Sequence, residues 1–233
     1  MKRSQMIWGL FVIGLTAAIL SCATDTPTKT ASATAPTDKD GFVQRFDVAE
    51  SDLVSTGKNP FFVLEPGFVL VLEGKEEGKP FVLTITVLNE TKKIGNVETR
   101  IVEEREVVNG KAGEVSRNYF AINKQNNDVY YFGEDAGGAW LSGKDGAHFG
   151  LMLPGTPKIG FRHYQEIAPK VAMDRAEIVG LDETVVTPAG KFEHCLKVEE
   201  TTPLEKGKEI KYYAPGIGMI VEGDLKLTKF SHK

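Results

Sequence analysis

Short apolar runs that alternate with polar residues fill the sequence after roughly its first quarter. In the run 80–88, Phe81, Leu83, Ile85 and Val87 occupy alternate positions. A period of two places these four side chains on one face of an extended strand. Because the runs are rich in β-branched residues and no window has a long helical period, the pattern predicts antiparallel β structure.

Turn residues divide the chain into successive hairpins. Asn109-Gly110 is the dipeptide best suited to a two-residue type I′ turn. A glycine-rich excursion over 134–160 interrupts the series, and one short strand around Trp140 is expected within it. The other expected strands are 68–75, 80–88, 97–108, 113–123, 128–133, 161–168, 173–186, 191–201, 208–214 and 218–230. The sequence therefore predicts an all-β fold: an antiparallel meander that forms a strongly twisted, curved sheet or a barrel-like single domain.

The N-terminus has the pattern of an export signal. Lys2 and Arg3 precede an apolar run over 6–20, which is 15 residues long. A helix that spans the hydrocarbon core needs about 20 residues. A positive start followed by a short apolar stretch is typical of a cleaved signal peptide.

The tetrapeptide Ile19-Leu20-Ser21-Cys22 resembles the lipobox of bacterial prolipoproteins, although Leu20 is bulkier than the residue often found there. The resemblance implies that the Cys22 thiol receives a diacylglycerol, that the signal is cut before it, and that the new amino terminus is acylated, for example by palmitate. Two or three acyl chains make membrane attachment durable. The alternative is a secreted protein with an ordinary cleavage site.

Three segments follow from this: a lipoprotein signal peptide at 1–21, the lipidated Cys22 with a flexible tether to residue 40, and a single β-rich domain at 41–233. The tether is rich in Thr, Ala and Pro and carries no large apolar side chain. Such a composition cannot offset its ordering entropy. The expected location is the cell envelope, at the outer membrane facing the periplasm or the surface if the cell has two membranes.

The net charge and the cysteine content limit which binding partners and which disulfides are expected. Without Lys2 and Arg3, the chain has 26 basic and 32 acidic residues, a net charge near -6. This argues against nucleic acid. With Cys22 acylated, Cys195 has no partner for a disulfide, and it is expected to be a small packed side chain.

Known catalytic and cofactor motifs do not occur. The sequence has no G-x-S-x-G elbow, phosphate loop or dinucleotide fingerprint. His194 alternates with apolar residues and is expected on the core side. His163 and Glu166 are expected on opposite faces of a strand. We therefore predict no cofactor, no metal and no enzymatic activity.

Three carboxylates in the glycine-rich excursion are the candidate ligand or ion contacts: Glu134, Asp135 and Asp145. Their oxygens could bind calcium, but the spacing fits no calcium-loop signature. A solvated acidic turn is the simpler interpretation. Aromatic doublets on several strands place one ring on each face, which is consistent with either a second packed layer or a groove for an apolar or glycan ligand.

Four blocks, 59–67, 130–135, 187–205 and 212–218, are similar to those of a widespread group of uncharacterised bacterial lipoproteins. They read NPFFVLEPG, YYFGED, TPAGKFEHCLKVEETTPLE and YYAPGIG, in that order. The resemblance covers nearly the whole expected domain and implies no known activity.

These observations predict a membrane-anchored envelope lipoprotein whose β domain binds or scaffolds without catalysis. The first alternative is a carrier or sensor that holds an apolar ligand in the curved sheet. The second is an enzyme whose residues meet only in the fold, in which case His163, Glu166 and either Glu134 or Asp135 would converge in one cleft.

Overall fold

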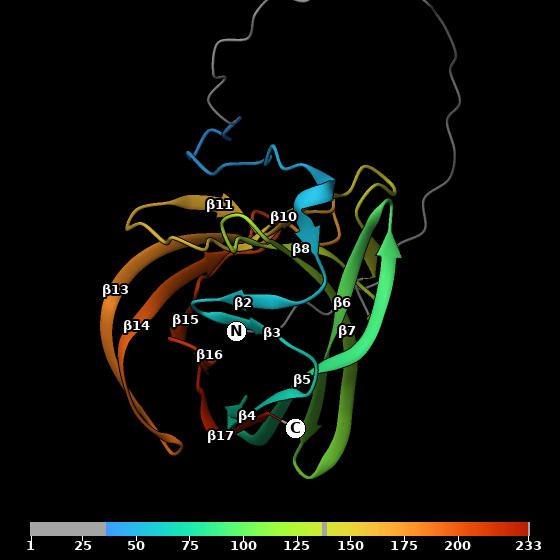
Figure 1. Cartoon of the computed structure of the whole chain (residues 1–233). Helices are drawn as coiled ribbons and strands as arrows, with labels where there is room; N and C mark the ends of the chain where they lie inside the picture. The colour runs from blue at the N-terminus through green and yellow to red at the C-terminus, as the bar shows by residue number, and fades with distance from the viewer. Residues whose placement is uncertain (1–35, 137–138, 233) are drawn as a thin grey trace, which may run out of the picture.

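The computed structural model describes residues 36–136 and 139–232, which are nearly all antiparallel β-sheet (Figure 1). The all-β prediction is confirmed. Cys22 and the export signal lie outside the described residues. The one helical element in the described part is the 3-10 turn η1 (Glu50–Asp52). Within these two ranges, no helix has the length and hydropathy needed to cross a bilayer.

The first half of the sheet is a meander in which each main strand pairs with the next. Short strands flank it, since β1 (Leu53–Val54) pairs with β7 and β9 (Trp140–Leu141) pairs with β8. The six main strands, in order, are β4 (Phe68–Glu76), β5 (Lys79–Ile94), β6 (Val97–Val108), β7 (Lys111–Asn123), β8 (Val129–Glu134) and β10 (His148–Leu153).

The second half is another meander of five strands. They are β13 (Arg175–Thr187), β14 (Gly190–Thr201), β15 (Glu209–Ala214), β16 (Gly218–Glu222) and β17 (Leu225–His232). The sequence predicts one strand over 218–230, but a turn at Gly223 and Asp224 divides it into two.

Two connections join the meanders into a nearly closed barrel. β17 pairs antiparallel with β4, the first strand of the first meander. At the other edge, β11 (Arg162–Tyr164) pairs with β13 and β12 (Glu166–Ile167) pairs with β10, with only Gln165 between them. A Cβ at Gly150 of β10 would lie 2.5 Å from the Gln165 carbonyl, so this close approach requires glycine.

Side-chain alternation and turn chemistry follow the sequence. Along β5, Phe81, Leu83 and Val87 are buried on the inner face. Asn109 and Gly110 both have positive φ, 51° and 74°, and they join β6 to β7. This is the type I′ geometry that the dipeptide favours.

A separate hairpin lies across the ring of strands in Figure 1. It consists of β2 (Gly57–Asn59) and β3 (Phe62–Leu64), and we call it the plug hairpin. The buried Asn59 side chain donates hydrogen bonds to the carbonyls of Asn127 (2.9 Å) and Pro154 (3.0 Å). Val63 and Leu64 join the main apolar core. The hairpin is therefore fixed to the barrel by both polar and apolar contacts.

One prediction about the excursion over 134–160 is incomplete. The expected short strand at Trp140 is present as β9, but the excursion also contains β10. β10 is central to closure, since it pairs with both β8 and β12. Its sequence, HFGLML, lacks β-branched residues and contains a glycine, so the local pattern gave no signal for it.

Candidate functional site

The inside of the barrel contains a cavity of about 830 Å³. Its walls come from both meanders, from the plug hairpin and from the loops that precede β13 and β15. Two chemically different regions line it.

Aromatic and aliphatic side chains line the part of the cavity next to the plug hairpin. The ring of Phe62, on the hairpin, lies 5.1 Å from that of Phe120 on β7. Phe120 in turn stacks on Tyr131 of β8 at 4.8 Å. The other apolar residues of this region are Val63, Phe68, Leu70, Ile85, Val87, Val102, Met152, Ile217 and Met219. We call the whole set the apolar floor.

Three carboxylates form a contrasting region, which we call the acidic wall: Glu134, Glu166 and Asp174. Glu134 ends β8, Glu166 begins β12, and Asp174 precedes β13. Glu166 is 2% exposed, and its Oε1 accepts a hydrogen bond from the Asp174 amide at 2.6 Å. Among the described residues, none of the three is in the ion pairs that the structure forms.

Burial and neighbouring negative charge raise the pKa of all three carboxylates. Burial, with the charges of Glu104 and Glu114, raises the pKa of Glu134 to about 7. Burial and the charge of Asp174 raise the pKa of Glu166 well above its usual range. Asp174 is water-accessible and lines the cavity, yet desolvation by the surrounding protein and the charge of Glu200 raise its pKa to about 6. A cation in the cavity would stabilise the ionised form of these carboxylates.

The ammonium group of Lys211 lies beside the acidic wall, but it already forms ion pairs with two other carboxylates. Its Nζ lies 2.7 Å from a Glu200 oxygen and 3.3 Å from a Glu222 oxygen. Burial alone would lower the pKa of Lys211, but these two carboxylates outweigh it and raise the pKa well above its usual range. Gln165 also donates a hydrogen bond to Glu200 at 2.8 Å.

Tyr213 lines the cavity, and its hydroxyl is a buried polar atom. Tyr213 is 1% exposed, and its Oη has no hydrogen-bond partner among the described residues. Buried polar atoms are nearly always hydrogen-bonded. This atom therefore has bonding capacity that a cavity occupant could use.

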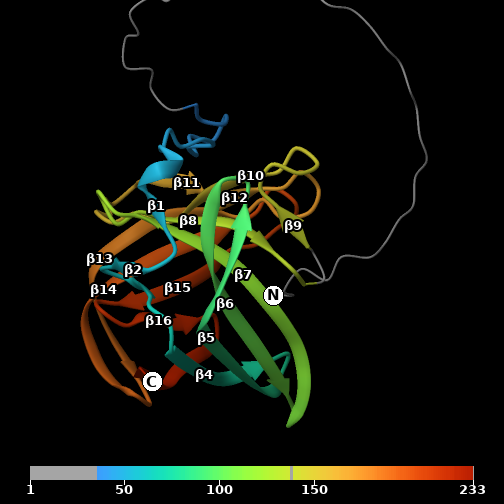
Figure 2. The same ribbon diagram turned by 45° about the vertical axis from the view of Figure 1, so that its right-hand side comes forward.

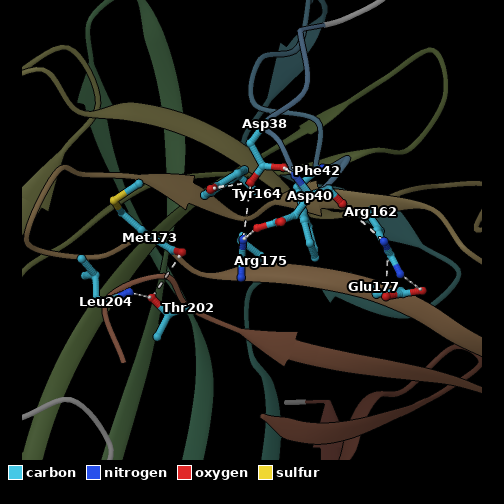
Figure 3. Close-up of polar contacts among 10 residues, drawn as sticks. All are labelled: Asp38, Asp40, Phe42, Arg162, Tyr164, Met173, Arg175, Glu177, Thr202 and Leu204. Atoms are coloured by element: carbon cyan, nitrogen blue, oxygen red, sulfur yellow. Dashed lines mark hydrogen bonds and ion pairs between the residues drawn. The ribbon is translucent and has the colours of Figure 1, made fainter. Parts of the chain in front are cut away.

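The N-terminal segment contacts the barrel close to this region (Figure 3). Tyr164 donates a hydrogen bond to Asp38 at 3.0 Å, and Arg175 forms ion pairs with Asp38 at 3.4 Å and Asp40 at 3.3 Å. Arg162 pairs with Glu177 at 2.9 Å. Residues 36–40, which the sequence places in the tether, thus lie against the domain, and Figures 1 and 2 show this segment over β11.

Two loops meet at the cavity. Thr202 Oγ1 donates to the Met173 carbonyl, and the Leu204 amide donates to Thr202 Oγ1, both at 3.4 Å (Figure 3). Because 171–172, Asp174, 200–202 and 204–209 line the cavity, these contacts fix its border next to the N-terminal segment.

The structure brings the three candidate ion contacts, Glu134, Asp135 and Asp145, to a second and smaller pocket of about 250 Å³. Lys92 and Lys144 line the same pocket. Asp135 accepts hydrogen bonds from the Tyr119 hydroxyl at 2.7 Å and the Arg117 amide at 3.1 Å. Within residues 36–136 and 139–232, no cluster of acidic, histidine or cysteine side chains is arranged to hold a metal ion. Of the three, only Glu134 also lines the main cavity.

The residues proposed for a hidden catalytic site do not all meet. Glu134 and Glu166 line the cavity, whereas His163 and Asp135 do not. His163 is fully buried and stacks on Phe161, with ring centroids 5.0 Å apart. Burial lowers the pKa of His163 to about 4, so the ring is neutral at pH 7.

The prediction that His194 faces the core is wrong. Its side chain is 77% exposed and contacts Asp182. The β13–β14 register shifts between Glu183 and Val185, and His194 has a φ of 57°. This bulge reverses the alternation. The prediction that Cys195 is packed is confirmed, since it is free and 0% exposed, and burial raises the pKa of its thiol.

Sequence reasoning did not find Asp174, Glu200, Lys211 or Tyr213 as site residues. Each lies on or beside a strand as an ordinary polar or aromatic residue. A possible signal was the placement of Glu200, Lys211 and Glu222 on the inner side of their strands, where buried charges need partners. Their convergence depends on barrel closure.

No family model matches the sequence, and no curated protein matches it. Among solved structures, the chain is similar to a Bacteroides fragilis protein inferred to be exported, with a YmcC-like fold, at 18% identity and a TM-score of 0.42. It is also similar to a Parabacteroides distasonis protein inferred to be a lipoprotein, at 13% identity and a TM-score of 0.38. Each comparison covers 75% of this chain and 100% of the other. With both TM-scores below 0.5, neither likeness carries an argument about this chain.

Proposed function

We propose that the protein is an envelope lipoprotein, anchored through Cys22, whose barrel binds an amphiphilic small molecule without catalysis. The observation that carries the binding proposal is the cavity of about 830 Å³ with its apolar floor and acidic wall. Ligand sites in proteins are commonly of roughly 300–1,000 Å³, mostly apolar, with a few polar groups that orient the ligand.

The anchor proposal rests on the lipobox resemblance and on the export signal. A Cys22→Ser variant tests it, because serine cannot form the thioether. The protein should then leave the membrane fraction and lose incorporation of labelled palmitate. Retention in membranes with unchanged labelling would contradict the anchor but leave the binding proposal intact.

The binding proposal can be tested without lipid. A chain that begins at Ala23 keeps every described residue, and the core residues of the barrel begin only at Phe42. We call it the soluble chain. The probe is a fluorescent fatty amine or naphthalene dye whose emission rises in apolar surroundings. It should bind the soluble chain saturably, in a ratio near one to one.

Two neighbouring substitutions on β5 distinguish the cavity from the surface. Ile85 lines the cavity, whereas Thr84 lies on the opposite face of the strand. Ile85→Trp places an indole in the cavity and should weaken probe binding by about tenfold, which is about 1.4 kcal/mol. Thr84→Trp is the matched control and should leave binding unchanged. Equal affinity in both variants would overturn the proposal.

The enzyme alternative would rely on Glu134 and Glu166, because these two residues of the catalytic hypothesis line the cavity. A reproducible hydrolytic activity of the soluble chain, lost in Glu166→Gln, would favour it over binding alone.

A further inference from the structure

The three carboxylates of the acidic wall form no ion pair with a described lysine or arginine. Lys211 is shared between Glu200 and Glu222, and Lys208 pairs with Glu199 at 2.8 Å. Glu134, Glu166 and Asp174 remain outside these pairs and act on one another electrostatically. Glu166 is 2% exposed and Glu134 is half-buried, and a carboxylate away from bulk water is costly, so a counter-charge at this position would stabilise their ionised forms.

Tyr213 gives an independent indication of a ligand. Tyr213 lines the same cavity and is 1% exposed, and its Oη is a buried atom that has no partner among the described residues. A phenol oxygen can accept a hydrogen bond from an N–H donor. The same N–H group could also donate to the acidic wall, because both border one cavity.

Resting on the proposed function, the geometry points to a specific ligand class: an amphiphilic amine, with a primary or secondary ammonium group on an apolar chain or ring system. We infer that the ammonium group lies beside Tyr213 and is held by the carboxylates of Glu134, Glu166 and Asp174, with its N–H groups donating to the nearest of these oxygens. The apolar part lies on the floor formed around Phe62, Phe120 and Met219. Charge-assisted N–H to carboxylate hydrogen bonds are about twice as strong as neutral ones. An anionic head group would instead face three carboxylates.

A series of three ligands with the same chain length tests the charge preference: decylamine, 1-decanol and decanoate. Binding to the soluble chain is measured by displacement of the fluorescent probe, below the aggregation limit of each ligand. Decylamine should bind at least about tenfold more tightly than 1-decanol, and decanoate should bind most weakly.

A double variant that replaces two of the carboxylates by uncharged amides identifies the residues involved. Glu134→Gln with Asp174→Asn should reduce decylamine affinity to that of 1-decanol, whose own affinity should hardly change. The matched control is Glu77→Gln with Asp224→Asn, two exposed turn carboxylates outside the cavity. This control should retain the full preference. Tyr213→Phe should reduce decylamine affinity by a smaller factor.

The outcomes separate the two proposals. If all three ligands bind with equal affinity, the ammonium inference is overturned and the amphiphile-binding function stands. If decanoate binds most tightly, the inference is also overturned. If none of the three displaces the probe, the proposed function itself fails.

Discussion

The apolar floor and the acidic wall line the same cavity but have opposite effects on the stability of the fold. The floor continues into the barrel core, where Phe120 contacts Phe62 and Tyr131 and is 5% exposed. The wall carries carboxylates whose pKa values are raised by burial and by one another. The floor therefore adds stability through packing, whereas the wall subtracts stability when its carboxylates are ionised. The two regions therefore have different roles: the floor stabilises the fold, and the wall favours binding of a ligand.

The largest expected effect is at the floor. Phe120→Ala should lower the free energy of unfolding by about 4 kcal/mol, because it removes a buried ring and leaves a cavity. Urea denaturation followed by fluorescence measures this change. Phe230→Ala is the matched control, since Phe230 is 43% exposed, and it should cost well under half as much. Similar losses in both variants would remove the energetic basis of the comparison.

The second effect separates the paired carboxylates from the acidic wall. Lys211→Met should destabilise the protein by about 3 kcal/mol at pH 8, because Glu200 and Glu222 lose their shared buried cation. Urea denaturation at pH 8 measures the loss, with the exposed Lys226→Met as control. An equal loss in both variants would contradict the ion-pair explanation.

The third and smallest effect has the opposite sign. The pKa of Glu134 is about 7 in the folded protein, against an ordinary value of 4.5. The folded state thus holds this proton more tightly than the unfolded state, so the contribution to stability is full below pH 4.5 and is lost as pH rises through 7. Glu134→Gln should therefore stabilise the protein by about 2 kcal/mol at pH 8, after allowance for partial solvent screening, and by almost nothing at pH 4.5.

Glu77→Gln is the control for this third prediction, because Glu77 is an exposed turn residue outside the cavity. It should leave stability unchanged at both pH values. If Glu134→Gln destabilised the protein at pH 8, the acidic wall would not be under electrostatic strain.

Sequence pattern predicted the local structure well and the closure poorly. Alternation along 80–88 predicted the first part of β5, which continues to Ile94, and the Asn109-Gly110 dipeptide predicted the β6–β7 hairpin, because these features depend on neighbouring residues. β10 lies in a segment without β-branched residues, and the predicted strand 161–168 is divided at Gln165 into β11 and β12, which pair with different strands. Local pattern does not specify such a change of partner. The bulge at His194 lies within the hairpin of β13 and β14, and it reversed a face assignment because simple alternation does not predict a register shift.

For the candidate site as well, sequence pattern identified a residue with a local signal but not residues that meet through barrel closure. Glu134 was a candidate because it lies in an acidic, glycine-rich segment, and it does line the cavity. Asp174, Lys211 and Tyr213 were not candidates, because their proximity to Glu134 and Glu166 arises only when the second meander closes on the first. The candidate residue Cys22 lies outside the described residues, so its lipidation stays a prediction.

Methionine methyl NMR offers the most direct test that a ligand occupies the barrel. The soluble chain contains three methionines: Met152 and Met219 line the cavity, and Met173 does not. On titration with decylamine, the methyl signals of Met152 and Met219 should shift saturably with one common affinity, while that of Met173 changes less. Unchanged Met152 and Met219 signals at saturating decylamine, or a shift confined to Met173, would contradict ligand binding inside the barrel.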